Sequence, residues 1–277
     1  MPPRVVVLMA SLAALALPTI VTIAATWWST PEGAQGPIVV GIALWLIGRR
    51  WPAVLARTRR PPSPRVLLLA APILPVLLVA RIGGIVEVEG MMLYLFLLVL
   101  LYSVVGGAAL RQAWFGLFFL LFALPVPDSV IALATQPLRL MVSHAAVSLL
   151  TLAGYPVGSQ GVLIFIGQYE LLVADACSGL NSLLSLTALA LLYIYLRHRS
   201  EPRQALLLAA LAVPMAIVAN LVRVLVLVLL TYHCGAAIAQ SFLHELAGLL
   251  LFIAALGGIV AIDRVIQSLR PEPRHAS

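Results

Sequence analysis

The sequence predicts an all-α polytopic integral membrane protein with about eight transmembrane helices and a small external cap. Of its 277 residues, 62% are hydrophobic and only 10% are charged, whereas soluble domains average roughly 45–50% apolar and about 25% charged residues. Apolar runs near the ~20 residues that a spanning helix needs fill most of the chain. All 17 basic residues are Arg, and most lie in short segments between those runs. This pattern excludes a soluble enzyme, a disordered chain and a secreted disulfide scaffold.

The net charge of +7 does not indicate a nucleic-acid partner. The arginines flank apolar runs, as topology signals at a cytoplasmic membrane face do. The two cysteines, Cys177 and Cys234, are too few for a disulfide framework. No pair of Cys or His has the spacing of zinc ligands on one helix, so we expect neither a metal nor a cofactor.

The expected spans follow one another along the chain, separated by polar or turn-forming segments. They are residues 5–26, 35–48, 66–85, 91–110, 113–124, 180–196, 204–230 and 244–262. The first span follows Arg4 and is longer than the ~7–15 apolar residues of a signal peptide, so it is expected to remain as an uncleaved anchor. Glu87 and Glu89 are expected in a short loop between the third and fourth spans.

The distribution of arginine predicts that both termini are cytoplasmic. With eight spans, nearly all loop arginines fall on the inner side, and Arg139 is the clear outer cation. Residues 128–175 are expected to form the external cap, because another crossing there would turn the basic segment 197–203 outward. The whole chain, residues 1–277, is then one membrane-embedded domain.

Within the cap, the pattern predicts two kinds of structure. The first part, residues 129–153, is expected to lie on the outer face as an amphipathic or re-entrant helix pair that is broken at Gln136 and Pro137. Short β-like runs then follow at residues 161–165 and 169–173.

Arg223 is the clearest candidate for a functional side chain inside a span. An ionisable group there is costly and indicates a function or a partner. It lies about two turns from the outer end of the seventh expected span, and Asn220 shares its helix face. The structural alternative is an arginine that pairs with a carboxylate to stabilise the bundle.

Cys177 and His244 lie at the outer starts of the sixth and eighth expected spans. The N–H groups and dipole of a helix start favour a thiolate, and an imidazole transfers protons near neutral pH. Alone, each has a simpler explanation, a small buried thiol and an interfacial histidine. Together with Arg223 they supply a nucleophile, a cation for an oxyanion and a proton shuttle, which acyl transfer requires. His144 is a second candidate for the base, whereas His233 and Cys234 are expected in an outer loop without a partner motif.

Three motifs resemble the signatures of the exosortase/archaeosortase family. They are Cys177-Ser178-Gly179-Leu180, Asn220-x-x-Arg223-Val224 and Phe242-x-His244-Glu245-x-x-Gly248. The similarity extends to residues 28–36, 124–127 and 154–157 and to Gly161, so it covers nearly the whole chain. Asn181 departs from the family, in which a basic residue is frequent there, and this departure concerns substrate recognition.

The resemblance implies a membrane-embedded cysteine protease or transpeptidase that acts on exported proteins with a C-terminal sorting signal. Such a signal has a short motif, often Pro-Glu-Pro, then one spanning helix and a basic cluster. Cys177 is then the nucleophile, Arg223 stabilises the thiolate or oxyanion, and His244 is the acid and base. The supporting residues are Ser178, Gly179, Asn181, Asn220, Glu245 and Gly248.

The implied partners are membrane-anchored substrate proteins, an unidentified acceptor and the lipid bilayer, with no nucleic acid. The implied location is the cell inner membrane, with the active site at the outer, periplasmic face. Two alternatives stay open. One is a polytopic transporter in which Asn220 and Arg223 line a path for an anion, and the other is a non-catalytic partner in envelope polysaccharide export.

Overall fold

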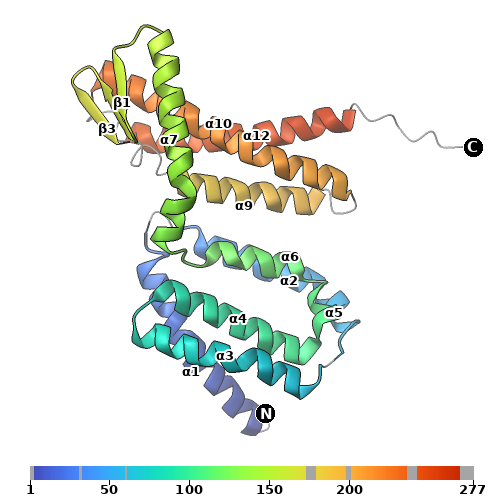
Figure 1. Ribbon diagram of the computed structural model, residues 1–277. Coiled ribbons are helices and arrows are strands. Elements are labelled where there is room, and N and C mark those ends of the chain that lie inside the picture. Colours follow the sequence, from blue (N-terminus) through green and yellow to red (C-terminus); the bar gives the residue numbers. More distant parts are fainter. Residues whose placement is uncertain are drawn as a thin grey trace, which may run out of the picture. The chain divides into compact units, whose positions relative to one another are not determined.

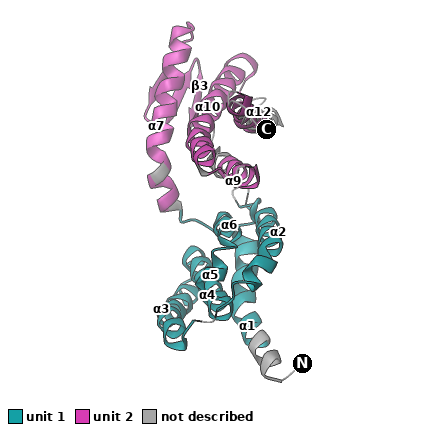
Figure 2. Cartoon of the chain, turned by 90° about the vertical axis from the view of Figure 1, so that its right-hand side faces the viewer, with its two compact units in different colours: residues 1–128 teal, residues 129–277 magenta. Residues whose placement is uncertain are grey.

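The computed structural model describes residues 3–30, 33–59, 61–172, 179–197, 201–235 and 242–268. The chain is mostly helical and divides into two compact units, Met1–Asp128 and Ser129–Ser277 (Figures 1 and 2). A mostly helical chain with long apolar helices confirms a polytopic membrane protein. A small β-sheet in the second unit is the exception to the all-α expectation.

The first unit consists of helices packed in pairs. They are α1 (Pro3–Thr26), α2 (Gly36–Leu55), α3 (Ser63–Ile82), α4 (Val86–Val105), α5 (Gly107–Leu110), α6 (Trp114–Phe119) and the 3-10 helix η1 (Leu120–Ala123). Helix α4 packs against both α3 and α1, and α2 packs against α6 and η1. The Trp28 indole N–H donates to the Ala123 carbonyl at 2.9 Å. A Cβ at Gly36 would lie 2.2 Å from Nε1 of that indole, so this packing requires a glycine.

The second unit combines helices with a three-stranded antiparallel sheet. Its elements are α7 (Asp128–Leu152), β1 (Val157–Gln160), β2 (Leu163–Ile166), β3 (Tyr169–Leu172), α9 (Gly179–Arg197), α10 (Pro202–Cys234) and α12 (Phe242–Ser268). Strands β2 and β3 confirm the two β-like runs, and β1 was not predicted. Gly161 (φ 62°) and Gly167 (φ 56°) open the two-residue turns, and a glycine first in the turn is typical of type II′ hairpins.

A buried apolar cluster joins the sheet to α7 and α10. It contains Val142, Ala146, Leu150, Ile164, Ile166, Leu171, Val224, Leu227 and Val228. Helix α7 runs crosswise to α9, α10 and α12 in Figures 1 and 2. Apolar residues at a helical spacing on its inner stripe explain why it packs onto the sheet and α10.

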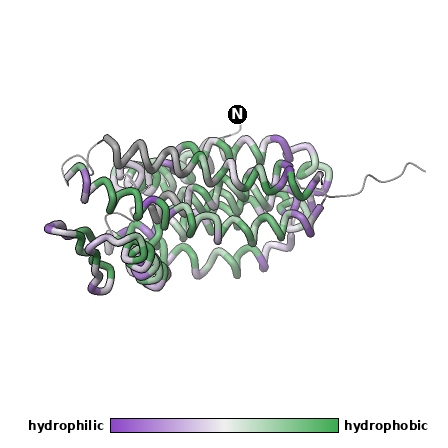
Figure 3. The backbone as a smooth tube through the Cα atoms, turned by 90° about the horizontal axis from the view of Figure 1, so that it is seen from above, coloured by the Kyte–Doolittle hydropathy of each residue, from purple (hydrophilic) through white to green (hydrophobic). Residues whose placement is uncertain are grey.

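Within the part of the chain that the structure describes, four helices are long and apolar enough to cross a membrane. They cover Gly36–Leu55, Ser63–Ile82, Val86–Val105 and Arg203–Cys234. Shorter apolar helices lie at Ala10–Thr26, Trp114–Ala123 and Ser185–Arg197, and apolar residues colour most of the helical lengths in Figure 3. The expected eight spans and the external position of the cap stay predictions.

Three local expectations are wrong. Glu87 and Glu89 lie in the first turn of α4, not in a loop. Helix α7 continues through Pro137 and is not broken into a pair. A proline removes only one intrahelical hydrogen bond, here to the carbonyl of the exposed Leu133, and the apolar stripe continues on both sides of it. The fourth expected span is also interrupted, because α4 ends at Val105 and Gly106 starts a break.

Gly106 is expected to tolerate no side chain. Its φ is 81° and its ψ 167°, and a Cβ would lie 1.9 Å from the Arg59 carbonyl oxygen. Backbone strain of this kind costs roughly 1–3 kcal/mol, so Gly106→Ala should lower the free energy of unfolding by at least about that amount. Thermal unfolding in detergent micelles measures this.

Gly107→Ala is the matched control. A Cβ there would meet Tyr102 at 3.5 Å, an ordinary contact, and alanine favours the helix that begins at this position. Equal stability of the two variants would contradict the role assigned to Gly106.

Candidate active site

Helices α9, α10 and α12 form a bundle in which the three signature motifs lie toward one end. Two layers of the bundle are Ala190 with Ala212 and Ile259, and Leu186 with Ala216 and Leu256. From the first layer to the second, residue numbers fall in α9 and α12 and rise in α10. Two further helical turns, about seven residues, lead to Gly179, Arg223 and the neighbourhood of Gly248. The bundle thus brings one part of each motif to a similar level.

Asn220 and Arg223 lie on one face of α10, three residues apart. Asn220 is buried and Arg223 is half-buried. Both have a polar interaction within the chain. The next residue, Val224, is fully buried in the cluster that joins α10 to α7 and the sheet. Arg223 therefore lies where the bundle meets the layer formed by α7 and the sheet.

The structure describes the remaining site residues only in part. Gly179 and Asn181 lie in the first turn of α9, and His244, Glu245 and Gly248 lie in the first two turns of α12. For these residues the backbone is described and the side chains are not. Cys177 and Ser178 lie outside the described residues, so the catalytic trio stays a prediction.

His233 and Cys234 had been expected in a loop. They are instead the last two residues of α10. His233 Nε2 lies 3.1 Å from the Tyr155 hydroxyl, with which it shares a hydrogen bond. The rings of Tyr155, Tyr232 and His233 meet edge to face, with centroids 5.1–5.8 Å apart. Cys234 is exposed, and so is His144 on α7, whose neighbours Val142 and Ser143 are buried.

Tyr232 and His233 border a surface pocket between the sheet and the end of α10. Its lining residues are Gly167, Gln168, Tyr169, Tyr232 and His233. Cys177 is the fifth residue after Leu172, the last residue of β3, and five residues of chain reach at most about 18 Å. Among the described residues, no group of three His, Cys, Asp or Glu is arranged to bind a metal.

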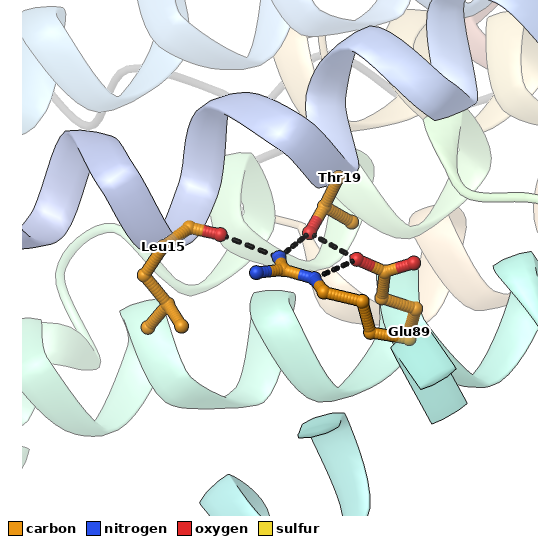
Figure 4. Close-up of polar contacts among 4 residues, drawn as sticks. Leu15, Thr19 and Glu89 are labelled. Atoms are coloured by element: carbon orange, nitrogen blue, oxygen red, sulfur yellow. Dashed lines mark hydrogen bonds and ion pairs between the residues drawn. The ribbon is translucent and has the colours of Figure 1, made fainter. Parts of the chain in front are cut away.

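The sequence analysis missed a partly buried ion pair in the first unit. Arg81 Nε donates to Glu89 Oε1 at 2.7 Å, and its Nη2 donates to Thr19 Oγ1 at 2.6 Å and to the Leu15 carbonyl at 2.7 Å. The Thr19 hydroxyl in turn donates to Glu89 Oε1 at 2.7 Å. Figure 4 shows this cluster between α1, α3 and α4. An arginine within an apolar run was the signal, because such a group requires a partner.

A second missed cluster lies in the other unit, at the end of the bundle away from Arg223. Its members are Tyr193, Gln204, Asp263 and Gln267. Asp263 directly follows the last expected span, and Gln204 begins the seventh. Sequence spacing does not reveal that they meet, because they come from different helices.

Comparison with known proteins identifies the family. Neither the curated proteins nor the solved structures include a match. The family model described as Transmembrane exosortase (Exosortase_EpsH) matches residues 27–261. This match includes all three motifs and residues of both units, and the chain therefore belongs to the transmembrane exosortase family.

Proposed function

We propose that this chain is a membrane-embedded cysteine protease and transpeptidase that cleaves C-terminal sorting signals from exported proteins. The observation that carries the proposal is the family match over residues 27–261, which includes the Cys177, Arg223 and His244 motifs. The packing of α9, α10 and α12 supports it, because these three helices carry or follow the motifs. Membership of a family of sorting-type membrane enzymes is consistent with acyl transfer. A bundle whose helices carry or follow the three motifs is also consistent with it.

The first half of the reaction forms a thioester. The Cys177 thiolate attacks the scissile carbonyl of the substrate, and the Arg223 guanidinium stabilises the oxyanion that results. Loss of one oxyanion donor costs about 3–4 kcal/mol in studied hydrolases. The imidazolium of His244 gives its proton to the leaving amine as the carbon–nitrogen bond breaks. The acyl group is then bound to sulfur, and the C-terminal fragment departs.

The second half releases or transfers the acyl group. A neutral His244 accepts a proton from the incoming amine or water as that group attacks the thioester carbonyl. The carbon–sulfur bond breaks, and Cys177 leaves as the thiolate. An amine gives a new amide, and water gives a free carboxylate. In this scheme the substrate helix docks beside the bundle, with its basic cluster inside and its motif at the outer face.

Hydroxylamine provides a direct test of the thioester. A reporter protein that ends in a Pro-Glu-Pro motif, one spanning helix and a basic cluster is incubated with the purified full chain in nanodiscs. We expect a shortened reporter whose new C-terminus is a hydroxamate, identified by mass spectrometry, because hydroxylamine outcompetes water for a thioester. The matched control is the same reporter without the motif.

Two results would contradict the proposal. One is a reporter that stays intact with this and other sorting tails, which would favour a transporter. The other is cleavage with only a free carboxylate at every hydroxylamine concentration, which would argue against an acyl-enzyme.

A further inference from the structure

Asp263 is a buried carboxylate to which three helices contribute. Its side chain is fully buried, on α12. The Tyr193 hydroxyl of α9 donates to Oδ2 at 2.6 Å, and Gln204 Nε2 of α10 donates to Oδ1 at 2.6 Å. Gln267, one turn further along α12, donates to Oδ2 at 3.1 Å. One carboxylate thus connects α9, α10 and α12.

The orientation of the Gln204 amide shows how strongly the carboxylate organises this cluster. Gln204 is 2% exposed, and its Oε1 has no hydrogen-bond partner among the residues that the structure describes. Turning the amide over would place this oxygen against the carboxylate of Asp263. A buried acceptor without a donor costs roughly 1–3 kcal/mol. The contact with Asp263 is therefore retained although an acceptor stays unsatisfied.

Small residues let the helices of this bundle approach closely. The adjoining layers combine Ala190, Ala212 and Ala216 with the larger Leu186 and Ile259. In a bilayer there is no hydrophobic force between helices, so small residues and interhelical hydrogen bonds provide the association. Fixing helix register is also the best-attested role of polar groups in apolar cores.

The cluster and the candidate site are at opposite ends of the same three helices. Gln204 and Arg223 are on α10 and 19 residues apart, which corresponds to about 28 Å along a helix. Going the same way, α9 leads from Tyr193 to Gly179, and α12 leads from Asp263 to His244. A shift of any one helix at the Asp263 end would move its motif at the other end by the same amount.

We propose that Asp263, together with Tyr193 and Gln204, is a positioning residue that sets the axial register of α9, α10 and α12. Through that register it aligns Cys177, Arg223 and His244. The inference rests on the proposed function, although Asp263 itself touches no substrate. A misplacement of about 1 Å in an active site can cost 10²-fold in rate, so a small slip between helices is enough to reduce turnover.

Variants of Asp263 distinguish this positioning role from a general loss of folding. D263L removes the acceptor for Tyr193 and Gln204, and we expect kcat for the reporter to fall about 10–100-fold while KM stays near the wild-type value. D263N should retain most of the turnover, because the Gln204 amide can turn over and its free oxygen can accept from the new amide. Q267A is the matched control, because Gln267 lies on the same helix as Asp263 and connects no other.

Exchanging the amide and the carboxylate between Gln204 and Asp263 tests whether the contact between these two side chains determines kcat. Q204E places two carboxylates against each other and should reduce kcat at least as much as D263L. The double variant Q204E/D263N restores one carboxylate and one amide, and kcat should recover to within about threefold of wild type. An equal loss of kcat in Q204E and in Q204E/D263N would overturn the proposal. An unchanged kcat in D263L would overturn it as well.

A distance measurement tests register without any activity. Val222 on α10 and Ile253 on α12 are exposed, so nitroxide labels can replace them in a variant without Cys177 and Cys234. We expect a narrow distance distribution for the otherwise unchanged chain, a shifted or broadened one with D263L and a restored one with D263N. An unchanged distribution in D263L would overturn the register role. Failure of the wild-type chain to process the reporter would instead count against the proposed function alone.

Discussion

The Cys177→Ala variant is expected to leave the reporter uncleaved. Alanine differs from cysteine by the loss of the sulfur atom, so the variant has no nucleophile at this position. Neither Arg223 nor His244 can form the acyl bond in its place. Loss of a catalytic nucleophile in a well-studied hydrolase reduces turnover on the order of 10⁶-fold, so no product should be visible on a gel. Mass spectrometry with hydroxylamine present should detect no hydroxamate. The uncleaved reporter should still co-purify with the variant, because the thiol is not needed for docking.

Cys234→Ala is the control for this experiment. Cys234 is the other cysteine of the chain, and it is exposed at the end of α10. Surface substitutions change stability by about 0.5 kcal/mol or less, so this variant should process the reporter within about twofold of wild type. Cleavage that survives in Cys177→Ala would remove Cys177 as the nucleophile. Loss of cleavage in Cys234→Ala alone would transfer that role to Cys234.

The sequence predicted helices and strands correctly where apolar residues continue along a single element. Helices α2, α3, α4 and α10 each correspond to a long apolar run, and such runs predict helices because a bilayer leaves backbone groups no other partner. The strands β2 and β3 were predicted from the short β-like runs at residues 161–165 and 169–173. Boundaries were less predictable. Helix α2 continues through Arg49 and Arg50 to Leu55, because arginines at a helix end are compatible with helical backbone.

Contacts between distant residues were not predictable in the same way. Arg81 and Glu89 are separated by a turn, and no periodicity reveals that Thr19 from α1 completes their cluster. Asp263, Tyr193 and Gln204 come from three helices, and their contact depends on helix register. The candidate site was predicted from the order of its motifs, and only the levels of Gly179, Arg223 and Gly248 follow from the packing of the described residues.

Removal of Glu89 is expected to destabilise the first unit strongly. Glu89 is 4% exposed and accepts hydrogen bonds from Arg81 and Thr19. Without it, the partly buried Arg81 guanidinium has lost its counter-charge. Breaking a fully buried ion pair from one side costs about 3–5 kcal/mol, so Glu89→Ala should lower the free energy of unfolding by up to about that much. Unfolding of the purified chain in mixed micelles of increasing SDS content measures the change.

Glu87 offers a matched control within the same turn of α4. The carboxylate that pairs with Arg81 is that of Glu89, so Glu87→Ala removes a carboxylate without breaking that pair. It should change the free energy of unfolding by less than about 1 kcal/mol. Similar losses in the two variants would mean that charge at the start of α4, and not the pair, determines stability.

The double variant Arg81→Met/Glu89→Leu separates the effect of the two charges on stability from the effect of burying side chains at these two positions. Two apolar side chains of similar volume carry no charge to desolvate, and such replacements are often neutral or stabilising. Most of the stability lost in Glu89→Ala should therefore return. The contacts of Arg81 with the Leu15 carbonyl and Thr19 are lost as well. Any remaining deficit therefore measures how much Arg81 contributes to binding α1. A double variant as unstable as Glu89→Ala would contradict the idea that the uncompensated charge of Arg81 accounts for the loss.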